Sequence, residues 1–476
     1  MKFSKIATAG IAALAVTSIQ SAKADVNWRQ FEGTTLNMIG FSVAYVDTWF
    51  KPMAKLFEKE TGIKLRLETL QAGQMRKKQD IMLAGEDDTL DLIMLQMDNR
   101  GGKLTVAGHL EPVEQYLKDP TLTPADYNYP GDWLGGCINT ASVIKGAPLN
   151  NIVWSAQAQL LHIRKDLFAK HNVKVPTTME ELEDAAKKLT MDTDGDGKTD
   201  IYGFMSRGYG RLTTASFASY LFNFGGSWVK DGPDGLRRSN LNSKESVDAF
   251  EFYGRMIRDY APKSVLNNKP PQNAALYSAG KAAMLSGLNF WHGLADNPKK
   301  SRIAGNTTTI LVPAGKAGSF PNLPTTSMAI SKYSKKKKAA WLYMAWMTQK
   351  RIMLKGQNAA VPMCRRSVWN DPSYKAPTPA WGKSAEMAAE YGIAIAKPQA
   401  IAIGQMRDAA GTVMNVAIRD GSRAAIQAEA DKQAKFMDGL IAKTEKGINF
   451  AGVLPKFAKK MTAEAQSAPI KADGMK

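Results

Sequence analysis

The chain has 476 residues, of which 22% are charged and 44% hydrophobic, a composition typical of a globular protein and not of a disordered one. Its formal net charge is +19, but the lysines are spread along the sequence and gather on no single motif, so nucleic acid is a poor candidate partner. About 450 residues remain after the N-terminal segment described next, which is more than one hydrophobic core usually supports, so we expect two domains.

Residues 1–24 have the pattern of a secretory signal peptide. Lys2 and Lys5 precede a short apolar run, and Ala22-Lys23-Ala24 forms an A-x-A site, which predicts export to the periplasm and cleavage after Ala24. No cysteine follows the apolar run, so we expect no lipid anchor, and loss of the three lysines leaves a net charge of +16. No later segment holds about 18 unbroken apolar residues, as a membrane-spanning helix requires.

The next elements alternate between strands and helices. Residues 35–41, 63–70 and 90–95 have strand patterns, and residues 45–60 and 74–84 have helical spacing between them. This order favours a parallel sheet with helices on both faces, an α/β fold. Ligands of such sheets bind beyond the carboxyl ends of the strands, which predicts a site formed by Ser42, Tyr45, Gln71 and Asp98.

Further elements follow without an internal repeat. Apolar spacing predicts helices over 213–224, 246–260, 335–350 and 424–442, and strands over 307–313 and 326–330. Residues 280–293 indicate a short strand followed by a glycine-flanked aromatic loop that contains Trp291.

Catalytic motifs are missing from the sequence. The four histidines are scattered, and no G-x-S-x-G, H-E-x-x-H or P-loop pattern occurs. We therefore expect a protein that is not an enzyme. A carbohydrate-active enzyme remains the alternative, because a catalytic pair of carboxylates cannot be recognised by counting acidic residues.

One acidic loop has the spacing of a calcium site. Asp192, Asp194, Asp196 and Asp200 occupy positions 1, 3, 5 and 9 of a calcium-binding loop, with Gly197 at position 6. Position 12 is Gly203, so the usual bidentate glutamate is missing. Either Ca²⁺ binds here with a more distant carboxylate, or the segment is a plain Asp/Gly turn. No other cofactor is expected.

The order of several segments resembles a known family. The most informative is WSAQAQLLHIRKDLFAKHNVKVPTTMEEL at 154–182, and the others are FEKETGIKL, DLIML, HLEPVEQYL, SAGKAAML, AISKYSKKKKAAWLYMAWM and VPMCRRSVWNDP. Together they resemble the extracellular solute-binding proteins of family 1, the maltose-binding-protein-like receptors of carbohydrate ABC importers. The resemblance implies a two-lobed type II periplasmic binding protein fold and a monomer that delivers a carbohydrate to an inner-membrane ABC permease.

The resemblance also implies where the chain passes between the lobes. In this family the chain crosses three times, which places crossings near Ser155, Leu311 and Ala360. Lobe 1 would comprise residues 25–154 and 312–359, and lobe 2 residues 155–311 and 360–470. In this layout Cys137 lies in lobe 1 and Cys364 in lobe 2. Although an even cysteine count permits a disulfide, a bridge between the lobes would restrict opening, so we expect two separate thiols.

Sugar recognition requires an aromatic ring for the apolar face of the sugar and planar polar groups for its hydroxyls. The resemblance implies that Trp291 is the stacking residue, and Trp154 is the next candidate. The predicted polar contacts are Gln157, Asp98, Arg207, Tyr209, Thr325, Thr326 and Arg365. Arg207, Arg365 and Arg366 also leave open an anionic ligand, such as a sugar phosphate or a uronate.

Overall fold

The computed structural model describes residues 26–43, 45–393, 397–450 and 461–475. The predicted signal peptide lies outside these residues. In the part of the chain that is described, no helix combines the length and the apolar character that crossing a membrane requires.

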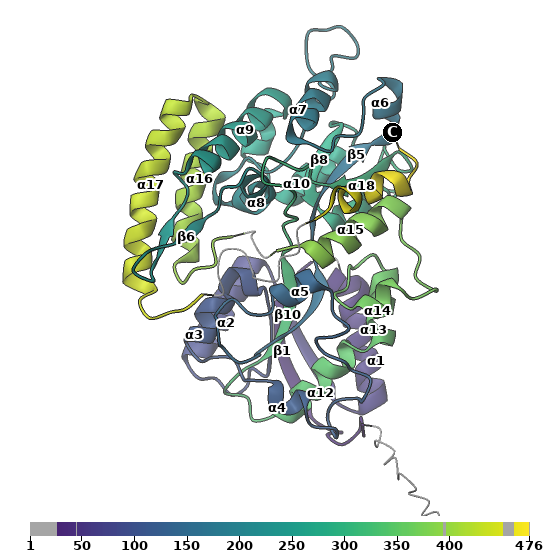
Figure 1. The fold of residues 1–476 in the computed structure, drawn as a ribbon. Coiled ribbons are helices and arrows are strands. Elements are labelled where there is room, and N and C mark those ends of the chain that lie inside the picture. The colour runs from purple at the N-terminus through teal and green to yellow at the C-terminus, as the bar shows by residue number, and fades with distance from the viewer. Residues whose placement is uncertain (1–25, 44, 394–396, 451–460, 476) are drawn as a thin grey trace, which may run out of the picture.

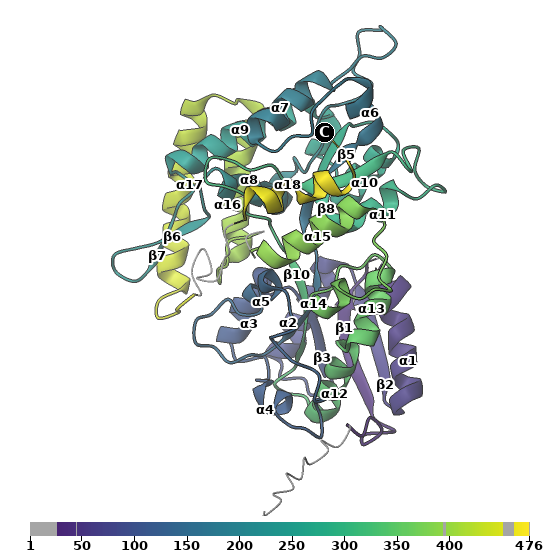
Figure 2. The same cartoon turned by 45° about the vertical axis from the view of Figure 1, so that its right-hand side comes forward.

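The chain forms two α/β lobes, one above the other in Figures 1 and 2. Lobe 1, the lower one, holds a five-stranded sheet in the order β2-β1-β3-β10-β4. Its strands are β1 (Thr35–Phe41), β2 (Lys64–Leu70), β3 (Leu92–Leu95), β4 (Ile152–Ala156) and β10 (Thr325–Ile330). Its helices are α1 (Lys51–Thr61), α2 (Ala72–Ala84), α3 (Gly102–Val106), α4 (Glu114–Leu117), α5 (Gly135–Asn139), α12 (Lys337–Met347), α13 (Lys350–Asn358) and α14 (Arg366–Trp369), with π-helical turns η1 (Val46–Phe50) and η2 (Met97–Gly101).

The burial pattern of each strand in lobe 1 matches its position in the sheet. All four residues of β3 are buried, as expected for a central strand covered on both faces, whereas β2 alternates between exposed and partly buried residues at the sheet edge. β1 pairs in parallel with β2 and β3, which confirms the predicted parallel arrangement. β10 is antiparallel to β3 and β4, so the start of β10 lies at the edge where β1, β3 and β4 end.

Lobe 2 is built around a three-stranded sheet in the order β8-β5-β9, with a small hairpin of β6 and β7. Its strands are β5 (Gln159–Arg164), β6 (Val229–Asp231), β7 (Arg237–Ser239), β8 (Met284–Leu288) and β9 (Thr307–Leu311). Its α-helices are α6 (Lys165–Lys170), α7 (Met179–Lys188), α8 (Thr214–Asn223), α9 (Lys244–Tyr260), α10 (Pro270–Ser278), α11 (His292–Ala295), α15 (Pro379–Tyr391), α16 (Ile403–Arg419), α17 (Arg423–Thr444) and α18 (Ala463–Ala472), and its 3₁₀ turns are η3 (Gly210–Leu212), η4 (Lys263–Leu266) and η5 (Asn289–Trp291).

The chain passes between the lobes along three segments. The first links β4 to β5 through Gln157 and Ala158, and the second links β9 to β10. The third lies later than the predicted crossing near Ala360. Met363 forms a bridge with Ser155 of β4, and the apolar residues from Val361 to Trp369 are buried in the core of lobe 1. The chain therefore leaves lobe 1 after α14, before α15 packs on β9 of lobe 2.

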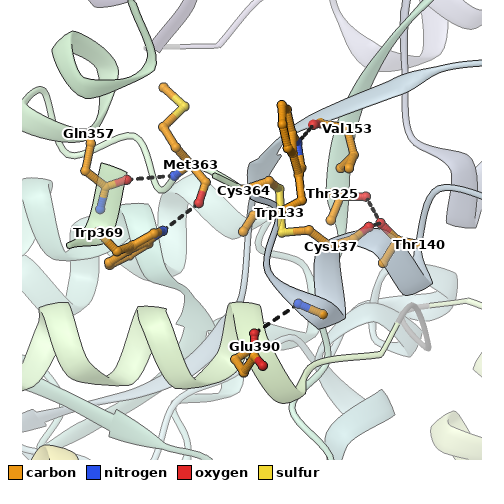
Figure 3. The surroundings of a disulfide bond; sticks show 12 residues. Trp133, Cys137, Thr140, Val153, Thr325, Gln357, Met363, Cys364, Trp369 and Glu390 are labelled. Carbon is orange, nitrogen blue, oxygen red and sulfur yellow. Dashed lines mark hydrogen bonds between the residues drawn. A yellow bond between two sulfur atoms is a disulfide. The ribbon is translucent and has the colours of Figure 1, made fainter. Parts of the chain in front are cut away.

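Cys137 and Cys364 form a disulfide, with their Cα atoms 5.8 Å apart (Figure 3). The expectation of two separate thiols is wrong, and the later crossing explains why. The backbone N–H of Cys364 donates to the carbonyl of Trp154 in β4, and its carbonyl accepts from the N–H of Leu134 next to α5. Both cysteines thus belong to lobe 1, so the bridge does not join the two lobes covalently.

Candidate functional site

Polar side chains meet where the first crossing joins the sheet of lobe 1. The amide of Gln157 donates to the hydroxyl of Tyr45 at 3.2 Å and to that of Thr326 at 2.9 Å. Burial raises the pKa of the Tyr45 phenol to about 12, so it stays a neutral hydrogen-bonding group at physiological pH. Tyr45 directly precedes η1, Gln157 lies in the crossing and Thr326 lies in β10, and together they place hydroxyl and amide groups at the edge where the strands end.

A buried ion pair joins the two lobes beside this group. Asp98 follows β3 in lobe 1, and one of its carboxylate oxygens lies 2.7 Å from the ammonium of Lys397, in the segment between α15 and α16 of lobe 2. Only 1% of Asp98 and 6% of Lys397 is exposed. The other oxygen of Asp98, Oδ1, is buried without a hydrogen-bond partner among the described residues. A free acceptor therefore faces the interface between the lobes.

Arg76 and Arg407 lie close enough to Lys397 to repel its ammonium, and Arg207 lies close enough to Arg407 to repel its guanidinium. Arg76 in α2 belongs to lobe 1, whereas Arg207, two residues after Met205, and Arg407 in α16 belong to lobe 2. Burial lowers the pKa of the Lys397 ammonium to about 8, because Asp98 compensates only in part and Arg407 and Arg76 repel it. Burial, together with repulsion from Arg76, Arg207 and Arg211, also lowers the pKa of Arg407 to about 10. The interface is thus strongly electropositive.

Three of the predicted contact residues are buried and packed or bonded within lobe 1. Trp154 is fully buried and packs against Tyr45, Trp49 and Phe50 with ring centroids 5.2–5.8 Å apart, so its ring is part of the core of lobe 1. Thr325 is also fully buried, and its hydroxyl bonds to that of Thr140 at 2.6 Å.

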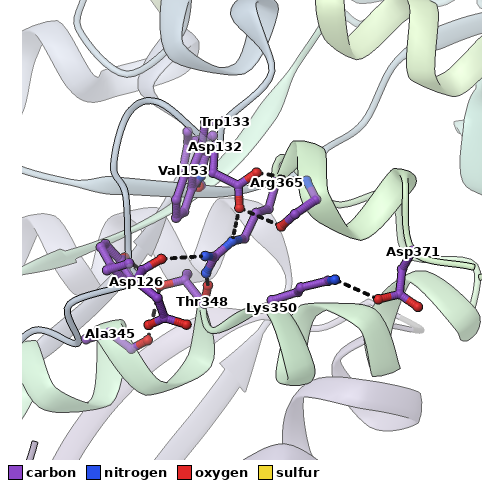
Figure 4. Close-up of polar contacts among 11 residues, drawn as sticks. Asp126, Asp132, Trp133, Val153, Ala345, Thr348, Lys350, Arg365 and Asp371 are labelled. Carbon is purple, nitrogen blue, oxygen red and sulfur yellow. Dashed lines mark hydrogen bonds and ion pairs between the residues drawn. The ribbon is translucent and has the colours of Figure 1, made fainter. Parts of the chain in front are cut away.

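Arg365 is the third of these buried residues (Figure 4). Its guanidinium forms an ion pair with Asp132 and donates to the backbone carbonyls of Thr348 and Asp126. All these groups belong to lobe 1, and only 4% of Arg365 is exposed. Arg366 pairs with Glu390 at the end of α15. Both of these arginines, which suggested an anionic ligand, are thus already paired with carboxylates of the chain.

The remaining predicted contact residues are exposed or partly buried. Ser42 and Gln71 are exposed where β1 and β2 end, and Tyr209 is 46% exposed before η3. Trp291 is partly buried against the core of lobe 2, with its ring 4.6 Å from that of Phe290. It follows β8 at the strand end that pairs with Gln159, next to the first crossing. This position suits a residue that contacts a ligand held between the lobes.

The acidic loop brings three of its four predicted ligands together. Carboxylate oxygens of Asp192, Asp194 and Asp200 lie within 4.8 Å of one another, whereas Asp196 pairs with Lys198 at 2.8 Å. The two oxygens of Asp192 accept the backbone N–H groups of Gly195 and Gly197. Oxygen ligands of this kind fit Ca²⁺, and the same contacts also stabilise an Asp/Gly turn.

Lys397, Arg407 and Arg76 were missed by the sequence analysis. Arg76 and Arg407 lie on helices that also carry exposed polar residues, such as Lys77 and Asp408, so their sequence positions alone do not distinguish them from surface residues. Lys397 did carry a signal, because it is the only charged residue in the apolar run GIAIAKPQAIAI at 392–403. A lone lysine in such a run indicates a buried charge with a distant partner.

The fold and the sequence were compared with known proteins. The family model of bacterial extracellular solute-binding proteins matches residues 42–353. The chain is 23% identical over 351 residues to an erythritol/L-threitol-binding protein of Mycolicibacterium smegmatis, covering 70% of this chain and 71% of the relative. It is 25% identical over 304 residues to a mannitol-binding protein of Pseudomonas aeruginosa, covering 62% and 65%.

A crystal structure of an ABC transporter solute-binding protein from Agrobacterium radiobacter K84, in complex with ribitol, has the same fold. It superposes with a TM-score of 0.71 at 24% identity and covers 86% of this chain and 99% of that one. The two lobes, the three crossings and the match over most of the sequence lead to one assignment: the chain belongs to the bacterial extracellular solute-binding proteins.

Proposed function

We propose that this protein captures a polyol or a small carbohydrate between its lobes and delivers it to the membrane permease of an ABC importer. The observation that carries the proposal is the meeting of buried polar groups from both lobes, above all Asp98 and Lys397, at the strand ends of lobe 1. The relatives named for erythritol, threitol and mannitol support this class of ligand. Closure of two lobes around a ligand is a general mode of such binding proteins.

Calorimetry with a panel of polyols, monosaccharides and oligosaccharides tests this function. We expect saturable binding of at least one member and, by chromatography, full recovery of that ligand after incubation. A reaction product would instead favour the carbohydrate-active enzyme, and no binding by any member would overturn the proposal. Size-exclusion chromatography should show a monomer with and without ligand.

Export is part of the proposal. Cleavage after Ala24 should leave Asp25 at the N-terminus, because the A-x-A site precedes it. Intact-mass measurement of protein from the periplasmic fraction checks this expectation. A mass that retains Lys2 and Lys5, or that includes an attached lipid, would contradict it.

Trp291 is proposed as the stacking residue for the ligand. Replacing its ring by alanine exposes roughly 80–120 Å² of ligand and protein surface, a loss of about 2–3 kcal/mol or about 30- to 150-fold in affinity. Because Trp291 is only partly buried, the melting temperature of Trp291→Ala should stay within a few degrees. Trp154→Ala is the matched control, since this fully buried ring should instead cost about 3–5 kcal/mol of stability. Normal ligand binding by Trp291→Ala would refute the stacking role.

The acidic loop is proposed to bind Ca²⁺ through Asp192, Asp194 and Asp200. Added Ca²⁺ should then raise the melting temperature and EDTA should lower it, because a ligand that binds only the folded state stabilises that state. Asp194→Ala should remove the response, whereas Asp196→Ala should keep most of it, since Asp196 pairs with Lys198. A wild-type protein that does not respond would identify the loop as a turn.

A further inference from the structure

The interface between the lobes carries more positive charge than its acidic groups balance. Asp98 is paired with Lys397, and no carboxylate in the described part of the chain forms an ion pair with Arg76, Arg207 or Arg407. The two other arginines nearby are already balanced, Arg100 by Asp80 and Arg211 by Asp408. Three guanidinium groups near the Asp98–Lys397 pair are therefore left without an ion pair to any described carboxylate.

The contacts of these arginines orient them without neutralising them. Arg407 donates from Nε to the hydroxyl of Thr214 at 3.1 Å and from Nη2 to the carbonyl of Arg211 at 2.9 Å. Its remaining nitrogen, Nη1, has no hydrogen bond to the described residues, although only 9% of Arg407 is exposed. The amide oxygen of Asn99, in its favoured orientation, accepts from Nη2 of Arg76 at 2.7 Å.

Arg207 is the most distinctive of the three. It is partly buried, and its guanidinium makes no hydrogen bond or ion pair with any described residue. Burial lowers its pKa to about 10, which leaves it charged at neutral pH. A buried guanidinium is costly unless a partner accepts its hydrogen bonds, and its planar fork fits the two oxygens of a carboxylate or phosphate.

We propose that the ligand is an anionic carbohydrate, a sugar or polyol that carries a carboxylate or a phosphate group, which Arg76, Arg207 and Arg407 bind. The inference rests on the proposed function, because it assigns the chemical class of the ligand held between the lobes. The free acceptor Oδ1 of Asp98 and the hydroxyls of Tyr45 and Thr326 supply the contacts for the hydroxyl groups of the same ligand. A neutral sugar would leave the guanidinium groups unpaired.

Matched pairs of ligands separate the two proposals. Calorimetry would compare D-galacturonate with D-galactose and D-gluconate with D-sorbitol, and sorbitol 6-phosphate would distinguish phosphate from carboxylate. We expect the acidic member of at least one set to bind 10-fold or more tightly than its neutral counterpart, with an affinity that falls as salt is added. Equal or tighter binding of the neutral members would overturn the anionic ligand and keep the proposed function, whereas no binding throughout would overturn both.

Proton uptake gives an independent readout. In the closed lobes without ligand, burial and the repulsion from Arg407 and Arg76 lower the pKa of Lys397 to about 8 although Asp98 opposes them, and an anion bound beside the ammonium raises that pKa again. At pH 8, binding of the acidic ligand should therefore take up protons, and its affinity should fall as the pH rises to 9. Calorimetry in HEPES and in Tris at the same pH measures this uptake. Binding of an acidic ligand without proton uptake would contradict its placement beside Lys397.

Variants test the arginines directly. Arg207→Gln and Arg407→Gln should each weaken binding of the preferred acidic ligand at least 10-fold and reduce its preference over the neutral counterpart. Arg255→Gln is the control, because Arg255 is already paired with Glu183 at 2.6 Å and should change affinity less than 3-fold. The melting temperatures without ligand identify any variant that fails to fold. Since Arg207 makes no side-chain bond to lose, a folded Arg207→Gln that retains full affinity and preference would refute the proposal.

Discussion

Lys397→Met should weaken ligand binding at least about 100-fold while leaving the protein folded. The substitution keeps the length of the side chain but leaves the Asp98 carboxylate buried without its partner. Breaking a buried ion pair in this way costs about 3–5 kcal/mol. The pair spans the two lobes, so opening of the lobes exposes Asp98 to water and avoids the cost. The penalty therefore acts on the closed, ligand-bound form, and calorimetry should detect it as lost affinity.

A double-mutant cycle that combines Asp98→Asn with Lys397→Met tests whether the loss of affinity comes from the ion pair. Replacing both members of a buried pair is often nearly neutral, because no uncompensated charge remains. Asp98→Asn combined with Lys397→Met should therefore bind ligand more tightly than Lys397→Met alone. Lys383→Met is the matched control, since Lys383 in α15 is 43% exposed and its pair with Glu386 is worth at most about 1 kcal/mol. If Lys397→Met binds ligand as tightly as wild type, the Asp98–Lys397 ion pair is not part of the ligand-binding site.

Much of the fold could be predicted because its signals are local. The predicted strand at 35–41 matches β1, and the predicted helices at 213–224 and 424–442 match α8 and α17 to within two residues at each end. Apolar periodicity within one segment determines such elements. The predicted helix at 335–350 corresponds to α12 (Lys337–Met347), which ends three residues earlier, because the chain becomes extended at Gln349, with a ψ of 146°, before α13 begins. Apolar spacing that continues into the next helix conceals a break of this kind.

Sequence patterns located the candidate site residues only where those residues lie at or near the end of a predicted strand. Gln157 directly follows β4, Asp98 lies three residues after the end of β3, and both are buried, Asp98 against Lys397 of lobe 2 and Gln157 in the first crossing. The pairing of Arg365 with Asp132 could not be predicted, because the two residues are 233 positions apart in sequence. Lys397 and Arg407 come from a loop and a helix, so only the tertiary structure shows that they meet Asp98. Charges brought together by long-range packing are therefore the part of this site that sequence patterns cannot give.

Removing the disulfide should lower stability without loss of ligand binding. The bridge joins residues that are 227 positions apart, so it greatly restricts the unfolded chain. Chain-entropy arguments predict that Cys137→Ala with Cys364→Ala costs about 2–5 kcal/mol in the free energy of unfolding. Urea unfolding measures this loss. Dithiothreitol should shift the wild-type midpoint toward that of the variant and leave the variant itself unchanged.

Ligand binding distinguishes a bridge within lobe 1 from one that limits opening. Cys137 lies in α5 and Cys364 beside β4, so the bonded residues move as one body when the lobes separate. The affinity of the double variant, measured by calorimetry at a temperature where it is folded, should therefore stay within about 3-fold of wild type. A bridge that constrained opening would give a large change in affinity on removal. That result, or an unchanged urea midpoint, would show that the bond does not act within lobe 1 as its position requires.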